Sequence, residues 1–286
     1  MSYRPQSFNV LPPVVKNLII INVLFFIASF TFQNIGSINL DTYLGMHMPI
    51  SQAFKPYQLI TYMFMHGSIG HIFFNLLAIW MFGSTLENYW GPRKFIIYYL
   101  VTGLGAALIH YAVVYYQMSP TLTAVNAIID NPSHAAMQAF LGSANFKIES
   151  VETLNHYQAF LADYHNYQSN TAIADTDGAT LKILDYLQLY KADLLNAPII
   201  LGASGALYGI LLAYGYLFPD NQVFIYFFPV KAKYLVIIYI AIELYTGIQA
   251  SVTDNVAHFA HLGGMFAGFI LLKIWKEKST GNNSYF

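Results

Sequence analysis

The sequence has 286 residues, of which 56% are hydrophobic and only 9% are charged, and its formal net charge is −1. A soluble domain is typically about a quarter charged, so this chain has too few charged residues to cover the surface of a soluble protein. It is therefore predicted to be a polytopic membrane protein. The net charge argues against nucleic acid as a partner, and the absence of cysteine excludes disulfides, a thiol nucleophile and cysteine-based metal sites.

Six apolar stretches are candidates for membrane-spanning helices, each of which needs about 20 mostly apolar residues. In chain order they are Leu18–Phe32, Ile72–Leu86, Phe95–Tyr116, Ala203–Phe218, Tyr234–Ile248 and Val256–Trp275. Several are short, which indicates a compact bundle. The first is not expected to be a cleaved signal peptide, because it lacks a clear small-residue cleavage site and further spans follow it.

The basic residues orient a six-span bundle, in which both termini lie on one side. That side carries nine of the thirteen Lys and Arg residues: Arg4, Lys16, Arg93, Lys94, Lys231, Lys233, Lys273, Lys276 and Lys278. The other side carries Lys55, Lys147, Lys182 and Lys191. Because cytoplasmic loops are enriched in Lys and Arg, both termini are predicted to be cytoplasmic, and the start of the fourth span to face the opposite side.

A polar, acidic segment at residues 117–197 interrupts the hydrophobic pattern with eight carboxylates and three lysines. Loops of this length without structure of their own are uncommon, and apolar residues at helical spacing predict helices at Val151–Tyr164 and Thr180–Leu195. We therefore expect an extracytoplasmic helical insertion at 117–197. It separates a core of three spans at 17–116 from a second at 198–275, with cytoplasmic ends at 1–16 and 276–286.

Polar residues inside membrane spans are costly and usually have a reason, and the first such group lies in "LGASGALYGI" at 201–210. Ser204 stands there between Gly202 and Gly205. The pair Gly205 and Gly209 forms a G-x-x-x-G pattern typical of close helix packing. Taken alone, the stretch favours packing over a serine nucleophile.

The second group, "HGSIGHIFFN" at 66–75, places His71 and Asn75 on one helix face, with His66 five residues before His71 and nearer the extracytoplasmic end of the span. Imidazole and carboxamide both donate hydrogen bonds, so the pair would suit a developing oxyanion. Hydrogen bonding between helices without catalysis fits equally well. A zinc protease motif H-E-x-x-H is absent from the sequence.

The third group, "AHFAHLGGMFAG" at 257–268, places His258 and His261 three residues apart, followed on the same face by Gly264 and Gly268. Either histidine is equally compatible with a general base and with a structural role.

The fourth group comprises two single carboxylates, Glu87 near the end of the second span and Glu243 within the fifth. Such groups serve either as proton relays or as local hydrogen-bond anchors. The anchor reading is favoured for both.

Together these groups supply a nucleophile, a base and two donors toward one end of the bundle, as an acyl-transfer site requires. The chain resembles the rhomboid family of intramembrane serine proteases in three motifs that occur in order: H-x-x-x-x-H-x-x-x-N, G-x-S-G and A-H-x-x-G-x-x-x-G. Their residues are His66, His71, Asn75; Gly202, Ser204, Gly205; and Ala260, His261, Gly264, Gly268.

The resemblance implies an all-α bundle of six transmembrane helices, of the bacterial form and placed in a bacterial inner membrane. It also implies that Ser204 is the nucleophile and His261 the general base. The oxyanion hole would consist of His71, Asn75 and the backbone N–H of Ser204.

Supporting residues are also implied by the resemblance. Tyr208 matches the family's aromatic residue that packs on the catalytic histidine, and His66 matches a histidine near the water-facing mouth. His258 falls outside the motif and is expected to line the cavity. Tyr57-Gln58 stands where the family often has Trp-Arg in the loop between spans one and two.

The expected reaction is hydrolysis of a peptide bond in or next to a transmembrane substrate, with transmembrane proteins and lipids as partners and neither cofactor nor metal. No acidic third member fits the motifs, although Glu243 and Asp254 are the nearest carboxylates in sequence, so a Ser204–His261 dyad is expected. The alternative is a catalytically inactive rhomboid-like protein that binds transmembrane clients. A transporter would predict inverted repeats, which the sequence lacks. The insertion either selects substrates or is a solvated decoration.

Overall fold

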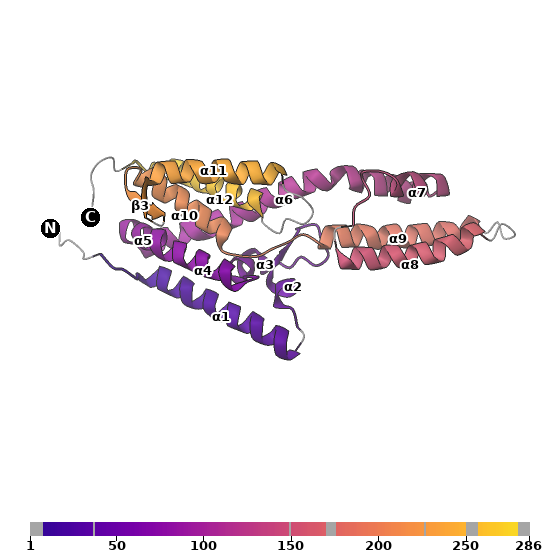
Figure 1. The fold of residues 1–286 in the computed structure, drawn as a ribbon, viewed down its shortest axis with the longest axis horizontal. Coiled ribbons are helices and arrows are strands. Elements are labelled where there is room, and N and C mark those ends of the chain that lie inside the picture. The colour runs from indigo at the N-terminus through magenta and orange to yellow at the C-terminus, as the bar shows by residue number, and fades with distance from the viewer. Residues whose placement is uncertain are drawn as a thin grey trace. The chain divides into compact units, whose positions relative to one another are not determined.

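The computed structural model describes residues 8–36, 38–148, 150–169, 176–225, 227–249 and 257–279. The chain forms two compact units of mainly helical structure (Figure 1). Unit 1 comprises Met1–Met46, Lys55–His110 and Ile200–Phe286, and unit 2 comprises His47–Phe54 and Tyr111–Ile199. The short strands β1 (Met46–His47) and β2 (Ile199–Ile200) stand at two of the places where the chain passes between units.

Unit 1 contains the apolar helices. It begins with α1 (Pro13–Gly36) and α2 (Leu40–Leu44). Its next part consists of α3 (Gln58–Thr61), the 3-10 turn η1 (Tyr62–Phe64), α4 (Ile69–Ala78), the π-helical turn η2 (Ile79–Gly83) and α5 (Ser84–Trp90). Helix α6 (Pro92–Asp130) continues into unit 2. The last part consists of α10 (Ser204–Leu217), the hairpin β3 (Gln222–Ile225) and β4 (Phe228–Lys231), α11 (Ala232–Gln249) and α12 (His258–Ile274).

Four helical segments in the described residues are long and apolar enough to cross a membrane: Pro13–Gly36, Ile69–Trp90, Pro92–Asp130 and Ala232–Gln249. The other two predicted spans are the shorter apolar helices α10 and α12. At about 1.5 Å per residue, α10 is shorter than the hydrocarbon core, and ten of its fourteen residues are buried inside the protein. The prediction of an all-α membrane bundle is confirmed. Val256, the predicted start of the sixth span, lies outside the described residues.

Glycines set the closest contacts of α10. A methyl carbon added at Gly264 of α12 would lie 1.9 Å from the carbonyl oxygen of Gly205, so the two backbones touch there. The G-x-x-x-G pair of α10 instead faces α6, because carbons added at Gly205 and Gly209 would meet Ala106 at 2.5 Å and Thr102 at 2.6 Å. The close approach of α10 to α12 therefore depends on Gly264, while Gly209 packs against α6.

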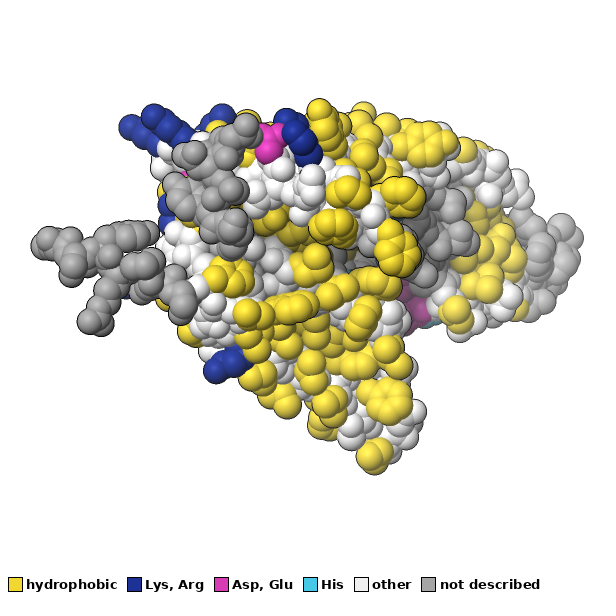
Figure 2. Space-filling model, turned by 60° about the vertical axis from the view of Figure 1, so that its left-hand side comes forward, with side chains coloured by type: hydrophobic (Ala, Val, Ile, Leu, Met, Phe, Trp, Pro, Cys, Tyr) yellow, Lys and Arg dark blue, Asp and Glu magenta, His cyan; other side chains and the backbone are white. Residues whose placement is uncertain are grey.

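Large apolar side chains remain exposed along the outer helices of unit 1. On α1, Leu24, Ile27 and Phe30 are 59%, 55% and 64% exposed. Figure 2 shows hydrophobic side chains over much of the visible face, with Lys and Arg gathered toward one end. Such continuous apolar surface is expected of helices that face lipid, and the chain is an integral membrane protein.

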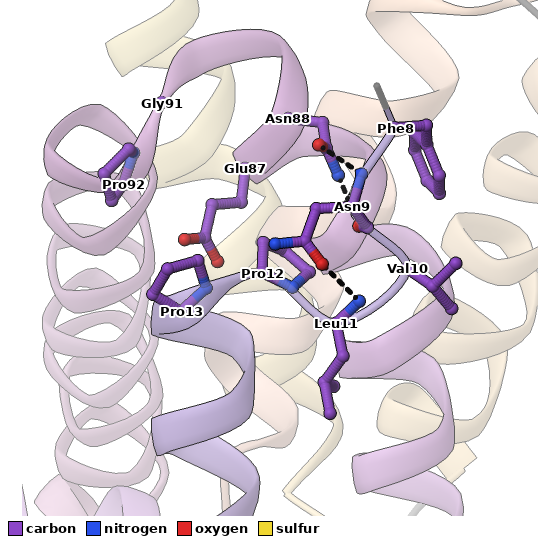
Figure 3. A pocket seen from close by; sticks show the side chains of 10 residues that line it. All are labelled: Phe8, Asn9, Val10, Leu11, Pro12, Pro13, Glu87, Asn88, Gly91 and Pro92. Atoms are coloured by element: carbon purple, nitrogen blue, oxygen red, sulfur yellow. Dashed lines mark hydrogen bonds between the residues drawn. The ribbon is translucent and has the colours of Figure 1, made fainter. Parts of the chain in front are cut away.

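Glu87 anchors the start of α1. Glu87 is 2% exposed, and its carboxylate accepts hydrogen bonds from the backbone N–H groups of Val14 at 2.9 Å and Val15 at 2.8 Å. Figure 3 shows this carboxylate directed toward Pro13, the first residue of α1. The first N–H groups of a helix lack intrahelical acceptors and carry partial positive charge. The contacts give Glu87 the role of a local hydrogen-bond anchor.

The loop between α1 and α4 is held by Gln58, which is 1% exposed. Its amide donates to the carbonyl oxygen of Tyr43, and its side-chain oxygen accepts from the backbone N–H of Lys55. The departure from Trp-Arg at Tyr57-Gln58 thus leaves this loop anchored by other contacts.

Unit 2 contains the end of α6 together with α7 (His134–Leu141), α8 (Val151–Ser169) and α9 (Thr176–Asn196). The predicted helices at Val151–Tyr164 and Thr180–Leu195 fall within α8 and α9, which run alongside one another (Figure 1). Aromatic rings join them, with Phe160 and Tyr186 stacked at a centroid distance of 4.3 Å. Unit 2 already includes Tyr111, whereas the predicted insertion begins at 117, inside α6.

Candidate active site

Ser204 and His261 lie together although they are 57 residues apart in sequence. Ser204 is the first residue of α10, and His261 lies in the first turn of α12. Nε2 of His261 is 2.9 Å from Oγ of Ser204, which is a hydrogen-bond distance. The backbone contact between Gly205 and Gly264 positions both residues, since each glycine lies within one turn of its reactive neighbour.

The ring of Tyr208 packs on the face of the His261 imidazole. Tyr208 lies one helical turn after Ser204 on α10, so both side chains point to the same face. Its ring stacks on that of His261 with a centroid distance of 4.2 Å and an interplanar angle of 7°. This contact restricts rotation of the imidazole.

Glu243 of α11 contacts the edge of the same imidazole, at Nδ1. Its Oε2 lies 3.0 Å from Nδ1 of His261 and 2.6 Å from Nδ1 of His258, and its Oε1 accepts a hydrogen bond from the hydroxyl of Tyr208. Although the first distance is short, Nδ1 of His261 makes no well-aligned hydrogen bond. The contact is therefore an electrostatic one between ring edge and carboxylate. Both Glu243 and His261 are buried.

Sequence reasoning missed this contact, because it favoured a local anchor role for Glu243 and expected no acidic partner for His261. The available signal was a lone carboxylate within an apolar span, which is costly unless donors surround it. His258, expected only to line the cavity, shares this carboxylate and also lies 3.0 Å from Oγ1 of Thr246.

His71 and Asn75 lie beside the loop before α10. A carbon added at Gly202 would lie 2.9 Å from Nε2 of His71 and 3.7 Å from Nδ2 of Asn75, and Gly202 has a φ of +112°. Glycine suits both the close approach and the left-handed backbone. The N–H of Gly202 donates to the carbonyl oxygen of Tyr62 in η1, which ties this loop to the segment before α4.

His66 orients the amide of Asn75. Burial lowers the pKa of His66 to about 4, with a smaller effect from neighbouring His71. The neutral ring places Nδ1 3.3 Å from the carbonyl oxygen of Phe64, while Nε2 accepts from the amide of Asn75 at 3.0 Å. One N–H of Asn75 is thereby used, and the amide has a second donor.

The residues that could ligate a metal overlap with this site. Among the described residues, Glu243, His258 and His261 form the group whose ligand atoms lie within 4.8 Å of one another. A metal on Nδ1 of His261 would require the proton of the neutral ring to sit on Nε2. Nε2 could then not accept the proton of Ser204, so the group fits a hydrogen-bonded cluster better than a metal centre.

Most of the residues described above lie in a part of the chain that matches a known protein family. A family model described as the rhomboid domain matches residues 53–129 and 177–277, more than half of the chain. All three motifs and Glu243 lie in the matched ranges, whereas residues 130–176 lie outside them. No curated protein matches the chain.

Proposed function

The chain belongs to the rhomboid family, and from this premise we propose that it is an intramembrane serine endopeptidase that cleaves membrane-anchored proteins. The observation that carries the proposal is the 2.9 Å contact between Nε2 of His261 and Oγ of Ser204. A serine hydroxyl is a weak nucleophile until an adjacent base takes its proton. The stacked ring of Tyr208 holds that base in place.

The reaction begins when Nε2 of His261 accepts the hydroxyl proton and Oγ of Ser204 attacks the scissile carbonyl. Collapse of the tetrahedral intermediate breaks the peptide C–N bond, and the proton on Nε2 passes to the leaving amine. Water then gives a proton to Nε2 and attacks the acyl carbon, and collapse of the second tetrahedral intermediate breaks the bond between that carbon and Oγ. Oγ takes the proton back from Nε2, which releases the acid and restores both Ser204 and the neutral His261. No cofactor takes part in these steps.

The oxyanion would be held by the backbone N–H of Ser204 and the side chains of His71 and Asn75. Ser204 opens α10, and N–H groups at a helix start are free of intrahelical acceptors and favour negative charge. The side chains of His71 and Asn75 lie close to Gly202, two residues before Ser204. Donors fixed before the charge develops are worth about 3 kcal/mol each in acyl-transfer enzymes.

Access to water and substrate follows from the position of Ser204 at the start of α10. With both termini cytoplasmic, as the distribution of Lys and Arg favours, this end faces the extracytoplasmic side. Transmembrane substrates would reach the site there, with cleavage favoured after small side chains and near helix-destabilising residues, as in the family. The six apolar stretches of the sequence are the basis for proposing six membrane crossings, and the resemblance of the motifs to the bacterial form of the family is the basis for proposing a bacterial inner membrane.

A fluorophosphonate probe, which reacts with activated serines, tests the proposal on the purified full-length chain. Labelling and cleavage of a model transmembrane substrate in liposomes should both disappear in Ser204→Ala and His261→Ala. The matched control is Ser84→Ala, which removes another buried serine hydroxyl of unit 1, one that donates to the carbonyl oxygen of Val10. Folded wild-type protein that neither labels nor cleaves would instead indicate an inactive protein that binds transmembrane clients.

A further inference from the structure

Glu243 lies on α11, the third helix of the site, and its carboxylate contacts Nδ1 of His261. Resting on the function proposed above, we propose that Glu243 is a positioning residue that holds the proton of His261 on Nδ1 and stabilises the imidazolium formed during catalysis. The chain would thus use a Ser204–His261–Glu243 arrangement in place of the dyad that the motifs imply.

Helix packing brings the carboxylate to this position. Glu243, Thr246 and Gly247 share one face of α11, since they are three and four residues apart. A carbon added at Gly247 would lie 3.2 Å from Cβ of His258, so α11 and α12 approach closely one turn beyond Glu243. His258 and His261 both face α11 at this point, and their Nδ1 atoms lie 2.6 Å and 3.0 Å from Oε2.

A hydrogen-bond donor and two ion-pair partners surround the carboxylate of Glu243. Glu243 is only 5% exposed within an apolar helix, where a charge without partners would be costly. Its Oε1 accepts from the hydroxyl of Tyr208, and its ion-pair partners among the described residues are His258 and His261. These three partners, Tyr208, His258 and His261, belong to the site or contact it, so the charge of Glu243 lies next to the catalytic histidine.

The position of the charge determines which nitrogen of His261 carries the proton. An anionic oxygen 3.0 Å from Nδ1 favours the tautomer with hydrogen on Nδ1, which leaves the lone pair of Nε2 directed at Oγ of Ser204. When Nε2 takes the serine proton, the positive ring is stabilised by the same oxygen, and Glu243 itself gains no proton. Catalytic hydrogen bonds are often poorly aligned before substrate binds, as the Nδ1 contact is here.

Tyr208 links the two functions of this cluster. Its ring stacks on His261, while its hydroxyl holds the carboxylate that faces Nδ1. The imidazole is therefore fixed on its face by Tyr208, at Nε2 by Ser204 and at Nδ1 by Glu243.

The direct test replaces Glu243 by Gln in the full-length chain and compares kcat and KM for a transmembrane substrate. The amide can present an N–H to Nδ1 and stabilise the wrong tautomer, so kcat should fall by about tenfold or more, toward the roughly 10⁴-fold loss seen for the equivalent change in serine proteases. KM should stay unchanged, and Glu243→Asp should recover part of the lost kcat. The matched control is Glu87→Gln, a second buried carboxylate of unit 1, whose kcat should equal that of the wild type.

The outcomes separate this inference from the proposed function. Wild-type protein that is neither labelled by the probe nor able to cleave the substrate would contradict both the proposed function and the role of Glu243. Active wild-type protein with an equally active Glu243→Gln variant, or with an Asp variant no better than Gln, overturns the role of Glu243 alone. If Glu243→Gln does not fold, Tyr208→Phe decides: it keeps the ring and removes the hydroxyl, so kcat should fall about two- to tenfold at constant KM, and an unchanged kcat would exclude the positioning role.

Discussion

Replacing Gly264 by alanine should separate Ser204 from His261 without removing any reactive group. The added carbon would lie 1.9 Å from the carbonyl oxygen of Gly205 and 2.8 Å from its carbonyl carbon. A close carbon–oxygen contact needs about 3.3 Å, so α10 and α12 must move apart by more than about 1 Å. Both clashing atoms belong to backbone, which cannot rotate away.

This movement would lengthen the contact between Nε2 of His261 and Oγ of Ser204, on which catalysis depends. Starting at 2.9 Å, the bond between Nε2 and Oγ would exceed hydrogen-bond distance. A misplacement of about 1 Å typically lowers activity about 10²-fold, and overpacking costs about 1–3 kcal/mol of stability. We therefore expect loss of kcat/KM and of fluorophosphonate labelling, together with a lower melting temperature in detergent.

Gly36→Ala provides the control, because its added carbon would make only ordinary contacts, with Ile38 at 3.5 Å. It should match the wild type in melting temperature and in activity. Wild-type activity in Gly264→Ala would refute the reasoning that the glycine contact sets the distance between base and nucleophile.

Three further predictions concern anchoring, orientation and metal independence. Glu87→Gln should lower the free energy of unfolding by about 1.5–3 kcal/mol, because the carboxylate accepts two backbone hydrogen bonds at the start of α1; thermal melting that matches the wild type would contradict this anchor role. Because the chain lacks cysteine, single cysteines at exposed Leu189 of α9 and Lys231 of β4 report orientation, and an impermeant maleimide applied to intact cells should label only the former; the reverse pattern would invert the predicted topology. Treatment with EDTA should leave cleavage unchanged, and loss of activity that zinc restores would show that Glu243, His258 and His261 hold a metal.

Spacing along single helices explains why much of the site could be predicted. His71 and Asn75 are four residues apart, as are Ser204 and Tyr208, and helical geometry places each pair on one face whatever the tertiary structure. The apolar stretches likewise predicted α10 as Ala203–Phe218, within one residue of its bounds at each end.

Contacts between helices could not be predicted in the same way. The G-x-x-x-G pattern of Gly205 and Gly209 indicated a close neighbour without identifying it, and the neighbour of Gly209 is Thr102 of α6. The approach to α12 instead depends on Gly264. Gly264 and Gly268 predicted a smooth face for a neighbouring helix, but the partner of Gly264 is a backbone carbonyl, which no side-chain pattern identifies. The length of α10 was also no guide to its burial, since helix length alone does not show whether protein or lipid surrounds it.

Glu243 shows why contacts between helices are hard to predict from sequence, and which physical rule would help to predict them. A single carboxylate has no spacing to match, and its neighbours depend on how α11 is rotated against α10 and α12. The cost of burying an unpaired charge nevertheless requires donors around it. Tyr208, His258 and His261 surround Glu243. The charge that must be satisfied for the bundle to fold is therefore satisfied by the groups that also orient the base, so stability and catalytic geometry depend on the same contacts.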